Sequence, residues 1–100
     1  MVAELLVDEP GPDRLRISGE IDTHTAPALA DRLADVPAGT NLGIDLTDTT
    51  FISSAGLATL LAAAERLEAA GGSLRLTAAS ETVARLVELS GLADRLPIGE

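Results

Sequence analysis

Two adjacent serines carry the hydroxyls whose place in the sequence best suits chemistry. Ser53 and Ser54 follow an apolar strand pattern at residues 42–46 and precede a long apolar helical stripe at residues 57–70. A serine at the start of a helix can cap it, because its oxygen accepts a hydrogen bond from a backbone N–H that has no partner inside the helix. The same N–H groups and the helix dipole favour an anion. The junction therefore indicates either a plain cap or a site where a phosphoryl group, adding a charge of roughly −1.5 to −2, acts as a switch.

A second set of chemically capable side chains is Glu20, Asp22 and His24, which alternate along the chain. An extended segment would place them on one side, as a carboxylate–imidazole metal site requires. We favour the interpretation that Asp22 and His24 are solvated loop residues near a helix start. A Ser–His–Asp triad would need Ser53 or Ser54 to meet His24 and a carboxylate. The sequence has no Gly-x-Ser-x-Gly nucleophile elbow, so we expect no hydrolase activity. The absence of lysine, cysteine and a second histidine leads us to expect no other enzymatic activity either.

The charge and composition of the chain exclude several classes of function. The net charge is −9, with seven arginines and no lysine. Nucleic acid and anionic membrane surfaces are poor partners for such a chain, because both need a basic footprint. The missing lysine removes Walker, Schiff-base and kinase-type lysine chemistry, and the missing cysteine removes thiol catalysis and zinc–thiolate sites. We expect no cofactor and no metal, and a partner that is a protein.

The length and the apolar content predict one small globular domain, residues 1–100. Phe51 is the only aromatic residue, so Leu, Ala, Val and Ile must build most of the core, and we expect Phe51 and Ile52 to lie in that core. No apolar run approaches the roughly 18 residues that span a bilayer, and the first residues lack the pattern of a signal peptide. These features predict a cytoplasmic protein without direct membrane insertion.

Strand patterns recur along the chain. An apolar run at residues 5–7, a turn at 8–13 and an alternating stretch at 14–18 predict an antiparallel hairpin, and residues 19–25 lead out of it. Further strands are predicted at residues 42–46 and 73–77, and a short extended tail at 95–98 could add a final edge strand.

Three helices alternate with these strands. Thr23 or Thr25 is the candidate cap of the first helix, the serine pair of the second and Ser80 of the third, while Gly71-Gly72 and Gly91 end the last two. The order β-β-α-β-α-β-α predicts an α/β domain whose mixed sheet has four to five strands, with helices mainly covering one face. The predicted inward positions are Ala26, Leu29, Ala30 and Leu33; Leu57, Leu60, Leu61, Ala64 and Leu67; and Val83, Leu86 and Val87.

Six short motifs share their types and order with a known family. They are Gly19-Glu20-Ile21-Asp22, Thr25-Ala26-Pro27-Ala28-Leu29, Ile44-Asp45-Leu46, Phe51-Ile52-Ser53-Ser54-Ala55-Gly56-Leu57, Gly71-Gly72 and Ser90-Gly91-Leu92. Together they resemble the STAS domain, and more narrowly the stand-alone bacterial anti-sigma factor antagonists. The resemblance extends over nearly the whole chain.

The resemblance implies a phosphorylation switch. Such an antagonist binds an anti-sigma factor that is also a serine kinase, which releases a sigma factor, and phosphorylation at the strand–helix junction separates the two proteins until a serine phosphatase resets the cycle. Aligned on Gly56-Leu57, the acceptor position falls on Ser54, with Ser53 as the alternative. The family often has an aspartate before the acceptor and a serine or threonine after it, whereas this chain has Ser53 and Ala55.

In the family, the loop after the second strand lies beside the acceptor. The resemblance therefore implies a partner surface formed by this loop and the helix start: Asp22, Thr23, His24, Ser53, Ser54, Ala55, Gly56 and Ala58. Small side chains at Ala55 and Ala58 would let a partner approach closely, or they are ordinary helix residues. An alternative function is that of a STAS adaptor subunit, either of a lipid-type ABC transporter or of a stress-signalling complex.

Overall fold

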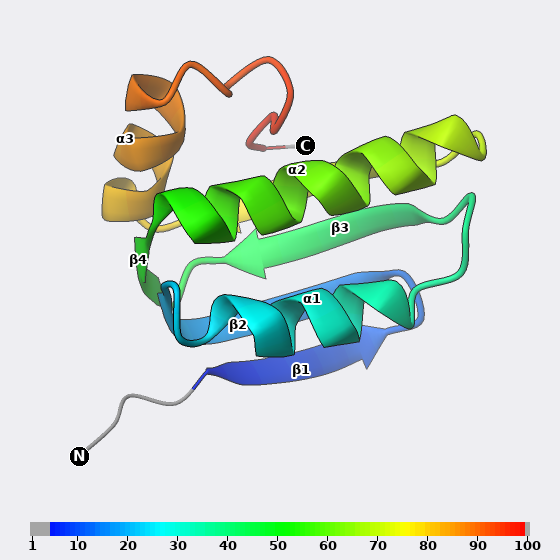
Figure 1. Cartoon of the computed structure of the whole chain (residues 1–100), viewed down its shortest axis with the longest axis horizontal. Helices are drawn as coiled ribbons and strands as arrows, with labels where there is room; N and C mark the ends of the chain where they lie inside the picture. The colour runs from blue at the N-terminus through cyan, green and yellow to red at the C-terminus, as the bar shows by residue number, and fades with distance from the viewer. Residues whose placement is uncertain (1–4, 100) are drawn as a thin grey trace.

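The computed structural model describes residues 5–99, and within that range the strands form one five-stranded sheet accompanied by helices (Figure 1). The predicted domain, residues 1–100, extends past both ends of this range, so residues 1–4 and 100 lie outside the described part. The elements in chain order are β1 (Leu6–Gly11), β2 (Arg14–Ile21), α1 (Ala26–Ala34), β3 (Asn41–Leu46), β4 (Thr49–Ile52), α2 (Ser54–Ala69), β5 (Ser73–Ala79) and α3 (Glu81–Leu89).

The sheet is mixed, as its alternating elements predicted. Its strands lie in the order β1-β2-β3-β5; β1 pairs with β2 in antiparallel fashion, and the remaining pairs are parallel. Strand β2 has two parallel partners in succession: its first half, at Arg14–Arg16, pairs with β3, and its last residues, Gly19 to Ile21, pair with β4. The hairpin and the mixed sheet are therefore confirmed, and β2 is the strand that connects the body of the sheet to β4.

Two strand boundaries were predicted too short. Strand β1 continues through Asp8 to Gly11, a stretch whose composition predicted a turn, and only Pro12 and Asp13 turn the chain. Pro10 is tolerated because β1 is an edge strand, where a missing N–H need not break the ladder. Residues 19–21, predicted to lead out of the hairpin, are the end of β2, because β4 pairs with them.

Strand β4 was not predicted, and it corrects the placement of Phe51. The Phe51 side chain is 41% exposed, whereas that of Ile52 is 2% exposed and lies in the core. Successive side chains of a strand point to opposite faces, so burying Ile52 turns the Phe51 side chain outward. The expectation that Phe51 is a core residue is wrong.

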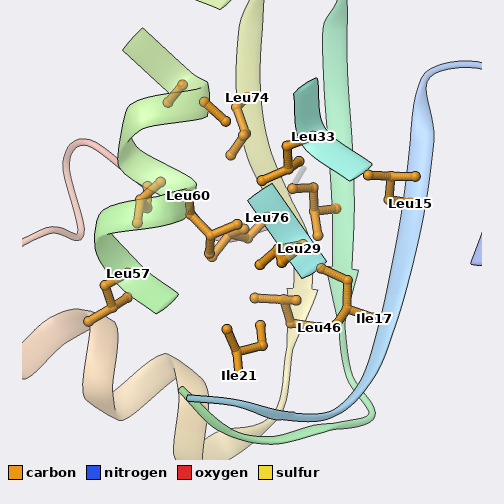
Figure 2. Close-up of a cluster of buried hydrophobic side chains, with 14 of the residues drawn as sticks. Leu15, Ile17, Ile21, Leu29, Leu33, Leu46, Leu57, Leu60, Leu74 and Leu76 are labelled. Carbon is orange, nitrogen blue, oxygen red and sulfur yellow. The ribbon is translucent and has the colours of Figure 1, made fainter. Parts of the chain in front are cut away.

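The core lies between the sheet and the helices α1 and α2, which cover one face of it (Figure 1). Figure 2 shows side chains of β2, β5 and both helices meeting there, among them Leu15, Ile17, Leu29, Leu60 and Leu76. Helix α3 packs at the end of the sheet beside β4 (Figure 1). The buried apolar side chains of the helices are those of Ala26, Leu29, Leu33, Leu57, Leu60, Ala63, Ala64, Leu67, Val83 and Val87.

Three predicted inward positions are not fully buried. Ala30 is exposed, and Leu61 and Leu86 are only partly buried. In α2 the face toward the sheet is centred on Leu60, Ala64 and Leu67, and it takes in Ala63 rather than Leu61. Apolar spacing gives a helical stripe its period, but the rotation of the helix about its axis follows from contact with the sheet.

The predicted helix ends agree with the structure, with one exception. Ser80 caps α3 by accepting a hydrogen bond from the Val83 N–H (3.2 Å), and Gly71 and Gly91 take positive φ values of 89° and 80° just after α2 and α3. Thr25 precedes α1 but makes no side-chain cap. As far as residue 99, the tail pairs with the sheet through a single parallel bridge, between Ile98 and Leu76.

Candidate functional site

The loop after β2 and the start of α2 meet at one end of the sheet. Both follow the carboxyl ends of adjacent parallel strands, and the backbone N–H of Ser53 donates to the carbonyl of Ile21 (2.8 Å). Helix α3 begins at the same end, because the Ser80 hydroxyl donates to the carbonyl of Thr49 in β4 (2.6 Å). Figure 1 shows β4 and the starts of α1 and α2 gathered there. Residues 31 and 32 positions apart in sequence thus become neighbours.

The two serines occupy different positions at this junction. Ser53 is the N-cap of α2: its backbone is extended, and its Oγ accepts a hydrogen bond from the Gly56 N–H (3.2 Å). Ser54 is the first residue of the helix and its side chain is exposed. The cap and the exposed hydroxyl are therefore two separate residues.

Gly56 lets α2 start close to the sheet. A Cβ atom at this position would lie 2.5 Å from Cγ2 of Ile21 and 2.8 Å from Cγ1 of Ile52. Both isoleucines are core residues. Glycine is therefore required for the helix to approach β2 and β4, and that approach fixes where Ser54 stands.

Asp22 organises the loop that precedes α1. Its Oδ1 accepts hydrogen bonds from the backbone N–H groups of His24 and Thr25, both at 2.9 Å, and lies 3.2 Å from the Thr25 hydroxyl. That hydroxyl donates to the carbonyl of Glu20 (2.7 Å) and accepts from the Asp22 N–H (2.9 Å). Asp22 is partly exposed, as expected, but it is a turn-forming residue rather than merely a solvated one.

Hydrogen bonding also sets the ionisation of Asp22. The hydrogen bond from the Thr25 backbone N–H is the main cause that lowers the pKa of Asp22 below its ordinary value of 3.8, because it stabilises the carboxylate. Desolvation opposes this effect and raises the pKa, while smaller contributions from the Thr25 hydroxyl and the His24 N–H lower it further. The loop therefore presents a fixed negative charge near the start of α2 at neutral pH.

The remaining predicted site residues lie in the Asp22 loop and in the first turns of α2. Thr23 and His24 are exposed in the loop, and Ala55 is partly buried in the first turn of α2. Ala58 is exposed one turn further along, where it lines a groove of about 380 Å³ between α1 and α2. Their contact with a partner stays a prediction.

The alternative chemistries find no support in the described geometry. Among residues 5–99, no three His, Cys, Asp or Glu side chains lie close enough together to hold a metal ion. The Asp22 carboxylate faces its own loop, while Glu20 is exposed on β2. In the same range, no helix is long and apolar enough to cross a bilayer.

Comparison with known proteins gives the family. The family model described as "Mlab, STAS domain" matches residues 6–98. The anti-sigma-B factor antagonist of Bacillus subtilis (strain 168) is 35% identical over 86 residues, which are 85% of this chain and 79% of that protein. The chain therefore belongs to the STAS domain family. Within that family it groups with the anti-sigma factor antagonists, which are regulators rather than enzymes.

Solved structures agree with this assignment. An anti-sigma factor antagonist from Mycobacterium paratuberculosis matches with a TM-score of 0.80 and 33% identity, over 98% of this chain and 86% of that chain. The phosphorylated form of the Bacillus cell fate determinant SpoIIAA has the same fold, with a TM-score of 0.67 over 97% of this chain and 92% of that chain; its sequence identity is 18%.

Sequence reasoning missed two features of this end of the sheet. The first is the hydrogen-bonding role of Thr25, which the spacing Asp22-x-x-Thr25 could have indicated, since aspartate side chains often accept from backbone N–H groups two or three residues later. The second is the exposed ring of Phe51. Its outward direction follows from strand β4, and that strand was not predicted from the sequence.

Proposed function

We propose that this chain binds an anti-sigma factor that is also a serine kinase, and that binding releases the sigma factor. The kinase then transfers the γ-phosphoryl group of ATP to Oγ of Ser54, and the complex dissociates. In this reaction the Ser54 oxygen forms the new bond to phosphorus, ADP leaves, and the hydroxyl proton passes to a base of the kinase. A serine phosphatase removes the phosphoryl group and restores the binding form.

The observation that carries the proposal is that the two serines have different surroundings: Ser53 caps α2, and Ser54 is exposed. The Ser53 oxygen already accepts a hydrogen bond from the Gly56 N–H, so transfer of a phosphoryl group to it would first have to break that bond. Ser54 is exposed at the first helical position, where a kinase can reach its hydroxyl without unfolding the helix. This geometry favours Ser54 over Ser53 as the acceptor.

A phosphoryl group on Ser54 suits the helix but not a protein interface. At the first turn of α2 the helix dipole stabilises a negative charge by about 0.3–1 kcal/mol, so the fold tolerates the modification. At an interface the same group must lose its water and faces the negative charges of a kinase nucleotide site, and like-charge contacts there cost several kcal/mol. Since about 1.4 kcal/mol is a tenfold change in affinity, charge alone can separate the complex.

Phosphosite mapping tests the acceptor. The chain is incubated with ATP and its anti-sigma factor kinase, and the product is mapped by mass spectrometry. We expect label on Ser54 in the parent and in Ser53→Ala, and none in Ser54→Ala. Label confined to Ser53 would contradict the proposal. A chain that does not bind the anti-sigma factor at all would instead favour the STAS adaptor function.

A further inference from the structure

Phe51 is the one aromatic residue of the chain, and it stands on the surface. Its side chain is 41% exposed, although the core beside it is built from aliphatic residues such as Ile52 and Ile21, which are 2% and 0% exposed. Single exposed apolar side chains are common on protein surfaces, so exposure alone assigns no role. The position of Phe51 and the rigidity of the strand that carries it indicate a role in binding.

Phe51 lies at the same end of the sheet as the proposed phosphorylation site. It precedes Ser54 by three residues and pairs with Glu20 of β2, next to the Ile21 carbonyl that accepts the Ser53 N–H. The large apolar side chains exposed within residues 5–99 are Leu6, Phe51, Leu89 and Ile98. Of these, Phe51 is the only one within three residues of Ser54.

The strand that carries the ring is firmly held. The Thr49 hydroxyl donates to the carbonyl of Ile17 (2.8 Å), the Ser80 hydroxyl donates to the carbonyl of Thr49 (2.6 Å), and Ile52 is buried in the core. A ring on such a strand loses little conformational entropy when a partner covers it, because its backbone is already ordered. Phenylalanine is among the residue types enriched at the buried centre of protein–protein interfaces.

We infer that Phe51 is the apolar anchor of the anti-sigma factor interface and inserts into an apolar pocket of that protein. The inference rests on the proposed function. It also explains why phosphorylation of Ser54 would be effective: an apolar anchor binds by excluding water, whereas a phosphoryl group in the same interface must keep its water. The two requirements conflict within one interface, so the modified chain dissociates.

Calorimetric titration with the anti-sigma factor tests the anchor, since the chain has no Trp or Tyr to serve as a fluorescence probe. We expect Phe51→Ala to weaken binding at least about tenfold. Phe51→Thr, which keeps strand propensity but removes the ring, should lose as much. The matched control is Ile98→Ala. Ile98 is also 41% exposed, but it forms a bridge to Leu76 of β5, whereas Phe51 is part of β4. Its affinity should stay within about twofold of the parent's.

The outcomes separate this inference from the proposed function. If the parent does not bind the anti-sigma factor, the proposed function is wrong. If the parent binds and either folded Phe51 variant binds equally well, only the anchor is wrong. Thermal unfolding of each variant is measured alongside; loss of folding in both Phe51 variants would also overturn the inference, because it would show that the ring supports the fold.

Discussion

Replacing Gly56 with alanine tests whether close packing holds the start of α2 in place. The added Cβ would lie 2.5 Å from Ile21 Cγ2 and 2.8 Å from Ile52 Cγ1. Because carbon atoms in contact are about 3.5–4.0 Å apart, the helix start must move by about 1 Å. Neither isoleucine can yield toward solvent, since they are 0% and 2% exposed. The shift would displace Ser54 as well.

The expected loss of stability follows from two opposing effects. Overpacking a core costs about 1–3 kcal/mol, and replacing glycine by alanine in a helix gains at most about 1 kcal/mol. The overlap involves two β-branched side chains, which have little rotamer freedom, so the upper part of the first range applies. We expect Gly56→Ala to lower the free energy of unfolding by about 1–2 kcal/mol and the thermal midpoint by at least about 4 °C.

A matched substitution separates the effect on the site from the effect on stability. At Gly71 an added Cβ meets nothing within 4 Å, but the φ of +89° would strain an alanine by about 1–2 kcal/mol. Thermal unfolding followed by circular dichroism should show both variants destabilised to a similar extent. Only Gly56→Ala should also slow phosphorylation of Ser54. A Gly56→Ala protein as stable as the parent, and phosphorylated at the same rate, would refute the packing argument.

Three further predictions concern the helix, the loop and the switch. Leu60→Ala should lower the free energy of unfolding by about 2–5 kcal/mol in denaturant titrations, because Leu60 is fully buried. Leu61→Ala should lower it clearly less, because Leu61 is only partly buried. Equal losses would contradict the observed rotation of α2. Asp22→Ala should destabilise the chain at pH 7. Because the pKa of Asp22 is lowered in the folded state, its carboxylate stabilises the fold fully above pH 3.8, and this stabilisation is lost as the pH falls through the folded-state pKa. The thermal midpoints of the parent and the variant should therefore converge below pH 3.8. A constant difference between the two midpoints down to about pH 2 would argue against this origin. Ser54→Ala should bind the anti-sigma factor like the parent, and Ser54→Asp at least about tenfold more weakly by calorimetry; equal affinities would refute the electrostatic switch.

Local signals in the sequence predicted much of this fold. Ser80 and the glycines at 71 and 91 marked helix ends correctly, because capping depends on backbone groups within a few residues. The alternating apolar residues of β2, β3 and β5 gave the face of the sheet that the helices cover, because a strand exposes alternate side chains to opposite sides. The apolar patterns on either side of the serine pair likewise placed it where a strand leads into a helix.

Tertiary contacts decided what these signals could not. Strand β4 has only four residues and exists because β2 extends beyond β3 and offers it an edge, so neither β4 nor the outward turn of Phe51 could be read from periodicity. The sequence by itself determined that two hydroxyls stand where a strand meets a helix. Only the packing of α2 against Ile21 and Ile52 decided where the helix begins, and thereby that Ser53 caps it while Ser54 faces solvent.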